Sequence, residues 1–490
     1  MRSEPYRTLV RALAVFFLAV VAGMFSACDV VDLDGAQPET SVSLQDALSD
    51  QTGFEGLLVS MYDRLQGTGL YGQQYMLYPD ALADNAQQVP GSSTNRYASV
   101  FQNVVRTHMG GYGGLYDTIN EANQIITNID GLGGLPDSRA DAIRNRIEGE
   151  ARFLRGLAYF DLVRIYSYMP GSGREVNEPS FGVPLRLAPT VGVPEQLSRT
   201  ETPQDIYDQI VTDFERAEEL LTNNEEVFNA PARINAGGVA AYLSRVHLYL
   251  ENYSDVEAAA GRALSKTSVS VVDAREGAFG SAWASASHPE SIFELTMTPG
   301  QDATGGGSAL QDLTFFFGSN FAYEVIPSND VVSIFADSDI RNTLFATDPS
   351  GNTYLTKYSG TRGNLADRIP LMRASELYLN RAEARAESNA ADALGDLNFV
   401  RVRRGLDPVT GLTGQELVDE VLEERRREFL FEGKRFFDLK RKAMDIPKPN
   451  TSNRVSIDYN GPLSESRLIL APLPNGEVQS NPLIEQNPGY

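Results

Sequence analysis

Residues 423–441, EERRREFLFEGKRFFDLKR, place arginines among phenylalanines, with three arginines in succession at 425–427. A helix that presents cations and aromatic rings on one side is typical of nucleic-acid binding. Here, however, six acidic and seven basic residues alternate between 420 and 441. The chain of 490 residues has 65 Asp and Glu against 42 Lys and Arg, and its net charge of −23 opposes binding to a polyphosphate. The sequence therefore opposes a nucleic-acid partner, and we interpret the stretch as a buried helix of mixed charge, in which Gly433 allows a bend or close packing.

Few residues of this chain have the types and spacing of a metal site or a catalytic site. The three histidines lie far apart, and Cys28 is the single cysteine, so a His/Cys metal cluster is not expected. Asp337 and Asp339 alternate in FADSDIRNTLF, as the first ligands of a calcium loop do, but the next alternate position is Arg341, which cannot bind a cation. Serine-nucleophile and phosphate-binding motifs are missing from the sequence. We therefore expect a protein that is not an enzyme and that has neither a metal nor a cofactor.

The first 28 residues, MRSEPYRTLVRALAVFFLAVVAGMFSAC, have the three parts of a secretory signal. Three arginines precede an apolar run over 12–25, which is shorter than the ~20 residues that cross a bilayer. Small residues and then Cys28 follow. A signal that ends at a lone cysteine resembles that of a bacterial lipoprotein, so we expect residues 1–27 to be removed and Cys28 to carry the lipid. The acidic segment 28–42 is predicted to be a tether without a core of its own.

Most of the remaining chain has the periodicity of helices. Residues 145–168 are apolar on two faces, which predicts a helix packed from both sides. Residues 239–265 and 374–406 each have the pattern of two helices with alanines at their contact, similar to tetratricopeptide repeats. Because such pairs bury their faces by stacking, we predict a mainly α fold, a single scaffold over 43–490 with long irregular loops and a few short strands. Residues 267–360 are rich in Gly, Ser and aromatic residues, with SIFEL as a strand candidate, and are predicted to be an irregular, ligand-side insertion.

Six stretches of the chain together resemble the SusD/RagB family, the nutrient-binding outer-membrane lipoproteins of Bacteroidetes. They occur in family order, and they are LYDTINEANQIITNI (115–129), GEARFLRGLAYFDLVRIYS (149–167), ASELYLNRAEAR (374–385), LNFVRVRRGL (397–406), EERRREFLFEGKRFFDLKR (423–441) and NPLIEQNPGY (481–490). The resemblance implies tetratricopeptide-like helix pairs and a lipid anchor on the outside of the outer membrane. It also implies that the protein captures oligosaccharide or glycan fragments and hands them to a SusC-like TonB-dependent transporter.

The same resemblance places ligand-binding residues in the loop after the first long helix and in the central insertion. From the loop we expect Asp84, Asn85 and Tyr97 to contact the ligand, and from the insertion Trp283 and Tyr323. Aromatic rings stack on sugar faces, and planar polar groups hydrogen-bond to hydroxyls. Trp283 is the single tryptophan, however, which leaves a peptide or another polymer open as the ligand. A tetratricopeptide-type interaction scaffold without a small ligand also stays open.

Overall fold

A computed structural model describes residues 48–89, 97–104, 106–170, 181–192, 194–228, 231–273, 279–298, 325–358, 367–448, 456–462 and 466–490. Cys28, the tether and Tyr323 lie outside the described residues. From Leu48 onward the chain forms one compact unit. Among the described residues, no helix is both long enough and apolar enough to span a bilayer.

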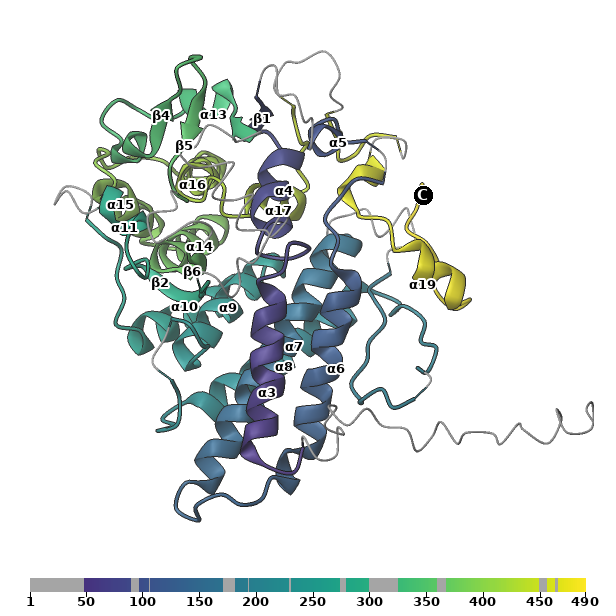
Figure 1. Ribbon diagram of the computed structural model, residues 1–490. Coiled ribbons are helices and arrows are strands. Elements are labelled where there is room, and N and C mark those ends of the chain that lie inside the picture. Colours follow the sequence, from purple (N-terminus) through teal and green to yellow (C-terminus); the bar gives the residue numbers. More distant parts are fainter. Residues whose placement is uncertain are drawn as a thin grey trace, which may run out of the picture. The chain divides into compact units, whose positions relative to one another are not determined.

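The long helices of the first half lie side by side (Figure 1). They are α3 (Gln51–Leu65), α6 (Tyr112–Asn128), α7 (Ala140–Tyr166) and α8 (Pro203–Leu221). The helix α7 packs against each of the other three, and nearly all of its side chains from 149 to 166 are buried. The prediction that this segment is a helix packed from both sides is confirmed.

Two pairs of short helices continue the scaffold. As predicted, residues 239–265 and 374–406 each form a pair, and the helices are α9 (Ala236–Tyr249), α10 (Tyr253–Lys266), α14 (Ala374–Glu387) and α15 (Ala393–Arg403). The helix α10 packs on α14, so the second pair stacks on the first. The predicted mainly α fold with stacked helix pairs is confirmed.

Among the described residues, the strands form three antiparallel pairs. They are β1 (Ala86–Gln88) with β3 (Val325–Pro327), β2 (Ser291–Leu295) with β6 (Ile369–Arg373), and β4 (Phe345–Thr347) with β5 (Thr353–Leu355). The predicted strand SIFEL is β2, and all residues of β2 and β6 are buried. The shorter helical elements are α4 (Gln74–Leu82), α5 (Ala98–Phe101), η2 (Ile129–Gly131), α11 (Phe279–Trp283), α13 (Asn329–Ser333), η5 (Ile340–Leu344), η6 (Arg467–Ile469) and α19 (Asn475–Ser480).

The charged stretch 423–441, which we interpret from the sequence as a helix, forms two helices separated by a turn that contains Gly433, where the sequence allows a bend or close packing. The helix α16 (Gly414–Glu428) ends at a turn, and α17 (Arg435–Arg441) begins after it. Within the turn, Phe431 and Gly433 have φ angles of 55° and 71°, which are left-handed values outside the α-helical region. The prediction that the stretch is buried and mixed in charge is confirmed, because most of the charged residues between 423 and 441 are buried.

The three successive arginines of α16 reach three different places, because neighbouring residues lie about 100° apart around a helix. Arg425 pairs with Asp438 of α17, with 3.1 Å between Nη2 and Oδ1. Arg426 lies 3.2 Å from the carboxylate of Asp84, which follows α4. Arg427 turns back to an acidic residue one turn earlier in α16. One short run of charge therefore fixes α16 both to α17 and to the N-terminal part of the unit.

A cluster of buried charges joins α16 to the β2–β6 sheet and to η5. At its centre, the Glu428 carboxylate accepts hydrogen bonds from Arg341, Arg373 and Arg404 over 2.7–3.0 Å. The last two arginines also donate to Glu290, at 2.7 and 2.8 Å. None of the five residues is more than 2% exposed. Burial alone would raise the pKa of Glu428, but the neighbouring guanidinium groups hold it well below its usual value, so the carboxylate stays charged.

We expect Gly433→Ala to lower the free energy of unfolding by about 3 kcal/mol. A Cβ atom here would overlap the backbone carbonyl of Tyr75 in α4, and the left-handed φ adds strain. Gly414→Ala is the matched control, because its φ of 53° is also left-handed but nothing lies within 4 Å of its Cβ position. The control is expected to lose about 1 kcal/mol. Urea unfolding followed by circular dichroism measures both losses, and equal losses would contradict the tight packing of this turn on α4.

Candidate functional site

Asp84 lies just after α4 and is held by arginines of α16 and α17. Its two carboxylate oxygens accept hydrogen bonds from Nε and Nη2 of Arg435, at 2.7 and 2.8 Å, and Arg426 completes the group. The residue is only 5% exposed. Although burial raises the pKa of the Asp84 carboxyl, the hydrogen bonds and charges of the two arginines outweigh this and lower it below its ordinary value. The Asp84 carboxylate therefore acts as a buried link between distant parts of the chain.

Asn85 and Tyr97 are also buried against protein partners. The Asn85 side chain donates to Asp80 Oδ1 at 2.8 Å and accepts from Arg426 Nε at 2.9 Å. The Tyr97 hydroxyl accepts a hydrogen bond of 2.5 Å from Gln73 Nε2. Asp84 and Asn85 thus meet through the same arginine.

Trp283, at the end of α11, belongs to a different set of contacts. Its ring centroid lies 4.5 Å from that of His288, and Lys357 Nζ lies 4.7 Å from its ring centroid. The side chain is 8% exposed. The structure therefore brings Asp84 and Asn85 together, whereas Trp283 lies near the charge cluster. The side chains of Asp84, Asn85, Tyr97 and Trp283 all contact other residues of the protein, and their contact with a ligand stays a prediction.

Asp339 and Arg341, whose spacing is similar to the start of a calcium loop, bind each other. Two guanidinium nitrogens of Arg341 donate to the two oxygens of Asp339, at 2.9 and 2.7 Å. These residues belong to the buried charge cluster around Glu428. In the part of the chain that the structure describes, no group of three or more His, Cys, Asp or Glu side chains is placed to hold a metal ion.

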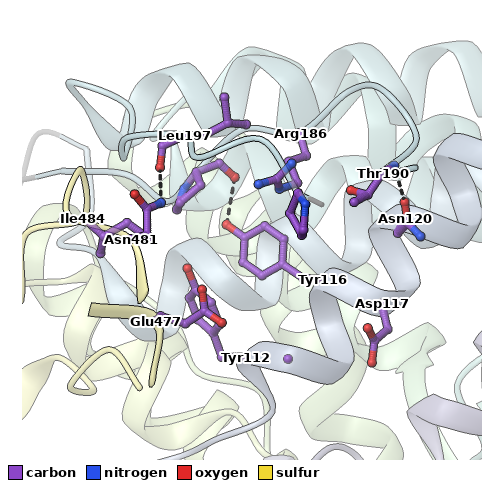
Figure 2. A pocket seen from close by; sticks show the side chains of 13 residues that line it. Tyr112, Tyr116, Asp117, Asn120, Arg186, Thr190, Leu197, Glu477, Asn481 and Ile484 are labelled. Atoms are coloured by element: carbon purple, nitrogen blue, oxygen red, sulfur yellow. Dashed lines mark hydrogen bonds between the residues drawn. The ribbon is translucent and has the colours of Figure 1, made fainter. Parts of the chain in front are cut away.

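An open cavity of about 260 Å³ lies at the N-terminal end of α6 (Figure 2). Its walls come from three separate parts of the chain, namely α6, the segment 184–197, and the segment 477–484, which begins in α19. We call this cavity the tyrosine cleft, and its polar side chains are Tyr112, Tyr116, Asp117, Asn120, Arg186, Thr190, Glu477 and Asn481.

The helix α6 supplies one wall of the tyrosine cleft through residues one turn apart. Tyr112, Tyr116 and Asn120 recur every four residues, which places them on the same side of the helix. The Tyr116 hydroxyl donates to the carbonyl of Pro184 at 2.7 Å, and Asn120 Oδ1 accepts from the backbone N–H of Thr190 at 2.7 Å. These two hydrogen bonds fix the facing segment along α6.

The C-terminal tail forms another wall and is anchored by two asparagines. Asn481 Nδ2 donates to the carbonyl of Leu197 at 2.9 Å. Asn487 donates from Nδ2 to the carbonyl of Tyr166 at 2.8 Å, and its Oδ1 accepts from Arg199 Nη1 at 2.8 Å. The ending NPLIEQNPGY therefore closes the tyrosine cleft by binding both the end of α7 and the segment 184–197.

Two tyrosine rings give the tyrosine cleft an aromatic surface. The ring centroids of Tyr112 and Tyr116 are 4.8 Å apart, and the ring planes are inclined by 49°. Figure 2 shows the ring of Tyr116 in the middle of the lining side chains. Burial raises the pKa of Tyr112 to about 12 and that of Tyr116 well above its ordinary value. Both hydroxyls are therefore neutral near pH 7.

A second cavity, of about 530 Å³, adjoins the tyrosine cleft along the segment 184–197. Arg186, Thr190 and Leu197 line both cavities. Leu187 and Val191, which are 45% and 81% exposed, also line the second one. Ligand pockets of proteins typically enclose about 300–1,000 Å³, and the two adjoining cavities provide space on this scale.

The residues of the tyrosine cleft are not those that the sequence predicts as ligand contacts. The stretches LYDTINEANQIITNI and NPLIEQNPGY carry the family resemblance, but nothing in their spacing indicates that they meet. One pattern in the sequence could have indicated this site, namely the recurrence of Tyr112, Tyr116 and Asn120 on one face of a helix. That pattern alone does not define a cavity, because the other walls, the tail and the segment 184–197, come from elsewhere in the chain.

Two family models match this chain and together cover both ends of the unit. The model described as "Starch-binding associating with outer membrane" matches residues 33–248, and the model described as "SusD family" matches residues 346–490. The chain belongs to the SusD/RagB family. All six stretches that carry the sequence resemblance lie inside the two matched ranges. The tyrosine cleft of this SusD-family protein is built from both ranges, since its walls come from α6, 184–197 and 477–484.

Relatives of known sequence and structure agree with this assignment. "SusD-like protein P2" of Formosa agariphila is 26% identical over 436 residues, which are 76% of this chain and 79% of that protein. "Starch-binding protein SusD" of Bacteroides thetaiotaomicron is 36% identical over 128 residues, 25% of this chain and 21% of that protein. A crystal structure of a SusD superfamily protein from Bacteroides thetaiotaomicron matches with a TM-score of 0.77 and 26% identity, covering 91% of this chain and all of that one.

We expect Asp84→Ala to destabilise this SusD-family protein by about 3 kcal/mol, because Arg426 and Arg435 stay buried without their carboxylate. Asp337→Ala removes an exposed carboxylate and is the matched control, with an expected loss below about 0.5 kcal/mol. Since the pKa of Asp84 is lowered in the folded state, its contribution is present above the unfolded-state value of about 3.9 and is lost as the pH falls through the folded value. Urea titrations at pH 7 and pH 3 measure the loss. Equal stability of both variants at pH 7 would contradict the structural role of Asp84.

Proposed function

We propose that this SusD-family protein captures oligosaccharide or glycan fragments in the tyrosine cleft. The observation that carries the proposal is the pair of uncharged tyrosine rings among amide, carboxylate and guanidinium side chains in one open cavity (Figure 2). The apolar faces of sugar rings stack on aromatic rings, and planar polar side chains bind hydroxyls. The name of one relative and the description of one matching family model include the term starch-binding, which supports a carbohydrate over other ligands.

The tyrosine cleft has its hydrogen-bonding groups in place before a ligand arrives. The bonds of Tyr116 to Pro184 and of Asn120 to Thr190 fix the facing segment without engaging the amide nitrogen of Asn120. A sugar hydroxyl can accept a hydrogen bond from this Nδ2 and donate one to a carboxylate of the cleft. Because the walls are already held together, less conformational freedom is lost on binding.

We further propose that capture takes place at the outer membrane, with lipid on Cys28 as the anchor. The order of basic start, apolar run and lone cysteine supports the anchor, and the name of the matching family model supports the outer membrane. We propose a SusC-like TonB-dependent transporter as the receiver of the captured glycan. The stacked pairs α9–α10 and α14–α15 support a protein partner, since helix pairs of this kind commonly bind proteins. They also support the second candidate function, an interaction scaffold without a small ligand.

We expect Tyr116→Ala to weaken oligosaccharide binding at least about tenfold, or about 1.4 kcal/mol, because it removes the central ring of the cleft. Tyr378→Ala is the matched control, since Tyr378 is a partly buried tyrosine of α14 that stacks on Phe399 at 4.1 Å, outside the cleft. Calorimetry with oligosaccharides of starch, xylan and mannan measures the affinities, and circular dichroism checks that each variant is folded.

The same experiment separates the candidate functions. If the oligosaccharide has no new reducing ends after incubation with the protein, the protein binds it without hydrolysing it. Equal affinities of the two tyrosine variants would contradict the tyrosine cleft as the site. If the wild-type protein binds no oligosaccharide but a membrane protein is purified together with it, the interaction scaffold is favoured. Calorimetry with short peptides then tests whether peptides are the ligand.

We expect Cys28→Ala to move the protein from the membrane fraction to the soluble fraction of cells. Acyl chains bind membranes because each buried methylene contributes about 0.8 kcal/mol, and the variant has no thiol to carry them. Purification of the wild-type protein from detergent extracts is expected to recover a TonB-dependent transporter. The proposal is wrong about the anchor if the variant stays on the membrane, and wrong about the partner if no transporter is recovered.

A further inference from the structure

We infer that the tyrosine cleft selects saccharides without acidic groups, so that it binds uncharged or amine-bearing sugars in preference to uronates and sulfated sugars. The inference rests on the proposed function and deepens it by naming the class of ligand.

Two carboxylates from different walls carry this inference. Asp117 lies on α6 and Glu477 on α19, and both line the tyrosine cleft. Asp117 is exposed and Glu477 is partly exposed. Within the described ranges, neither carboxylate has a hydrogen bond or an ion pair, and Figure 2 draws none to them. This differs from the core of the same protein, where carboxylates such as Glu428 are bound by several arginines.

The cations near the tyrosine cleft offset these charges only in part. Arg186 lines the cleft and keeps its positive charge, because its guanidinium donates to a neutral acceptor, the backbone carbonyl of Glu195, whose own carboxylate is exposed on the second cavity. Arg64, which interacts electrostatically with Asp117, is bound by Glu121 at 2.7 Å. Arg199 is only 7% exposed and donates to carbonyl and amide oxygens. The two adjoining cavities are therefore lined by three carboxylates, those of Asp117, Glu477 and Glu195, and by one guanidinium, that of Arg186.

This balance of charge acts differently on three classes of sugar. An uncharged hydroxyl can donate a hydrogen bond to either carboxylate. A protonated amine gains a charge-assisted hydrogen bond at the same place. A carboxylate or sulfate meets three like charges against the single guanidinium of Arg186, and the net charge of −23 adds a repulsive field around the whole protein. Because Asp117 and Glu477 face water, we expect discrimination of about tenfold rather than complete exclusion.

Affinity electrophoresis tests the class of ligand with the full mature protein. Each gel contains one polysaccharide: starch, xylan or galactomannan as neutral polymers, pectate or carrageenan as acidic polymers, or chitosan as the amine-bearing polymer. We expect retention by at least one neutral polymer or by chitosan, and dissociation constants for the acidic polymers that are at least about tenfold larger.

A double variant tests the residues that make the selection. The probe is the polymer that the wild type binds best, compared with the same polymer after its primary hydroxyls are oxidised to carboxylates. The Asp117→Asn/Glu477→Gln variant is expected to reduce a preference of about tenfold to about threefold or less. The matched control, Asp337→Asn/Glu416→Gln, removes two exposed carboxylates outside the cleft and is expected to keep the preference. Molar salt should also reduce the wild-type preference, because it screens exposed charges.

The outcomes separate this inference from the proposed function. If an acidic polymer binds as tightly as a neutral one, or if the double variant keeps the full preference, the inference is overturned while the protein remains a glycan binder. If no polymer retains the wild-type protein, the proposed function fails, and the inference fails with it.

Discussion

The burial of Glu428 is the constraint on which the second half of the scaffold depends. An ionised carboxylate in a protein interior is stable only when it is fully paired, since each unpaired buried charge costs several kcal/mol. Three arginines meet this need, and they come from η5, from the end of β6 and from the residue that follows α15. Pairing one side chain of α16 therefore fixes the relative positions of four elements. Apolar contacts alone would allow them to slide, whereas hydrogen bonds to a fixed carboxylate do not.

The same principle extends from the charge cluster to the N-terminal part of the unit. Arg426 and Arg435 leave α16 and α17 to bind Asp84, which follows α4. The turn between the two helices lies so close to α4 that Gly433 has no room for a side chain. The ion pairs of this stretch thus join α16 and α17 to the N-terminal part of the scaffold. Most of the arginines of this stretch are bound to acidic side chains within the protein.

The tyrosine cleft lies where this rigid scaffold meets irregular chain. The helix α6 packs on α7, and the end of α7 binds Asn487 of the tail through the Tyr166 carbonyl. Two of the three walls are loops, but each is fastened by hydrogen bonds to a long helix or to the other loop. The charge cluster and the cleft differ in how their carboxylates are paired. Glu428 in the cluster is bound by three arginines, whereas Asp117 and Glu477 in the cleft have no hydrogen bond or ion pair within the described residues.

The sequence by itself determined the family, the mainly α fold, the two helix pairs and the strand SIFEL, because these depend on local periodicity and on stretches of fixed order. Its net charge opposes a polyphosphate partner. Gly433 allowed a bend or close packing in the charged stretch, but the sequence did not show that the turn there packs on α4. Only the tertiary structure decided that Asp84 and Asn85 are buried ion-pair and hydrogen-bond partners, and that Tyr116, Arg186 and Glu477 share one cavity. A site built from residues up to 372 positions apart, from Tyr112 to Ile484, is defined by chain packing, and spacing along the sequence carries no record of it.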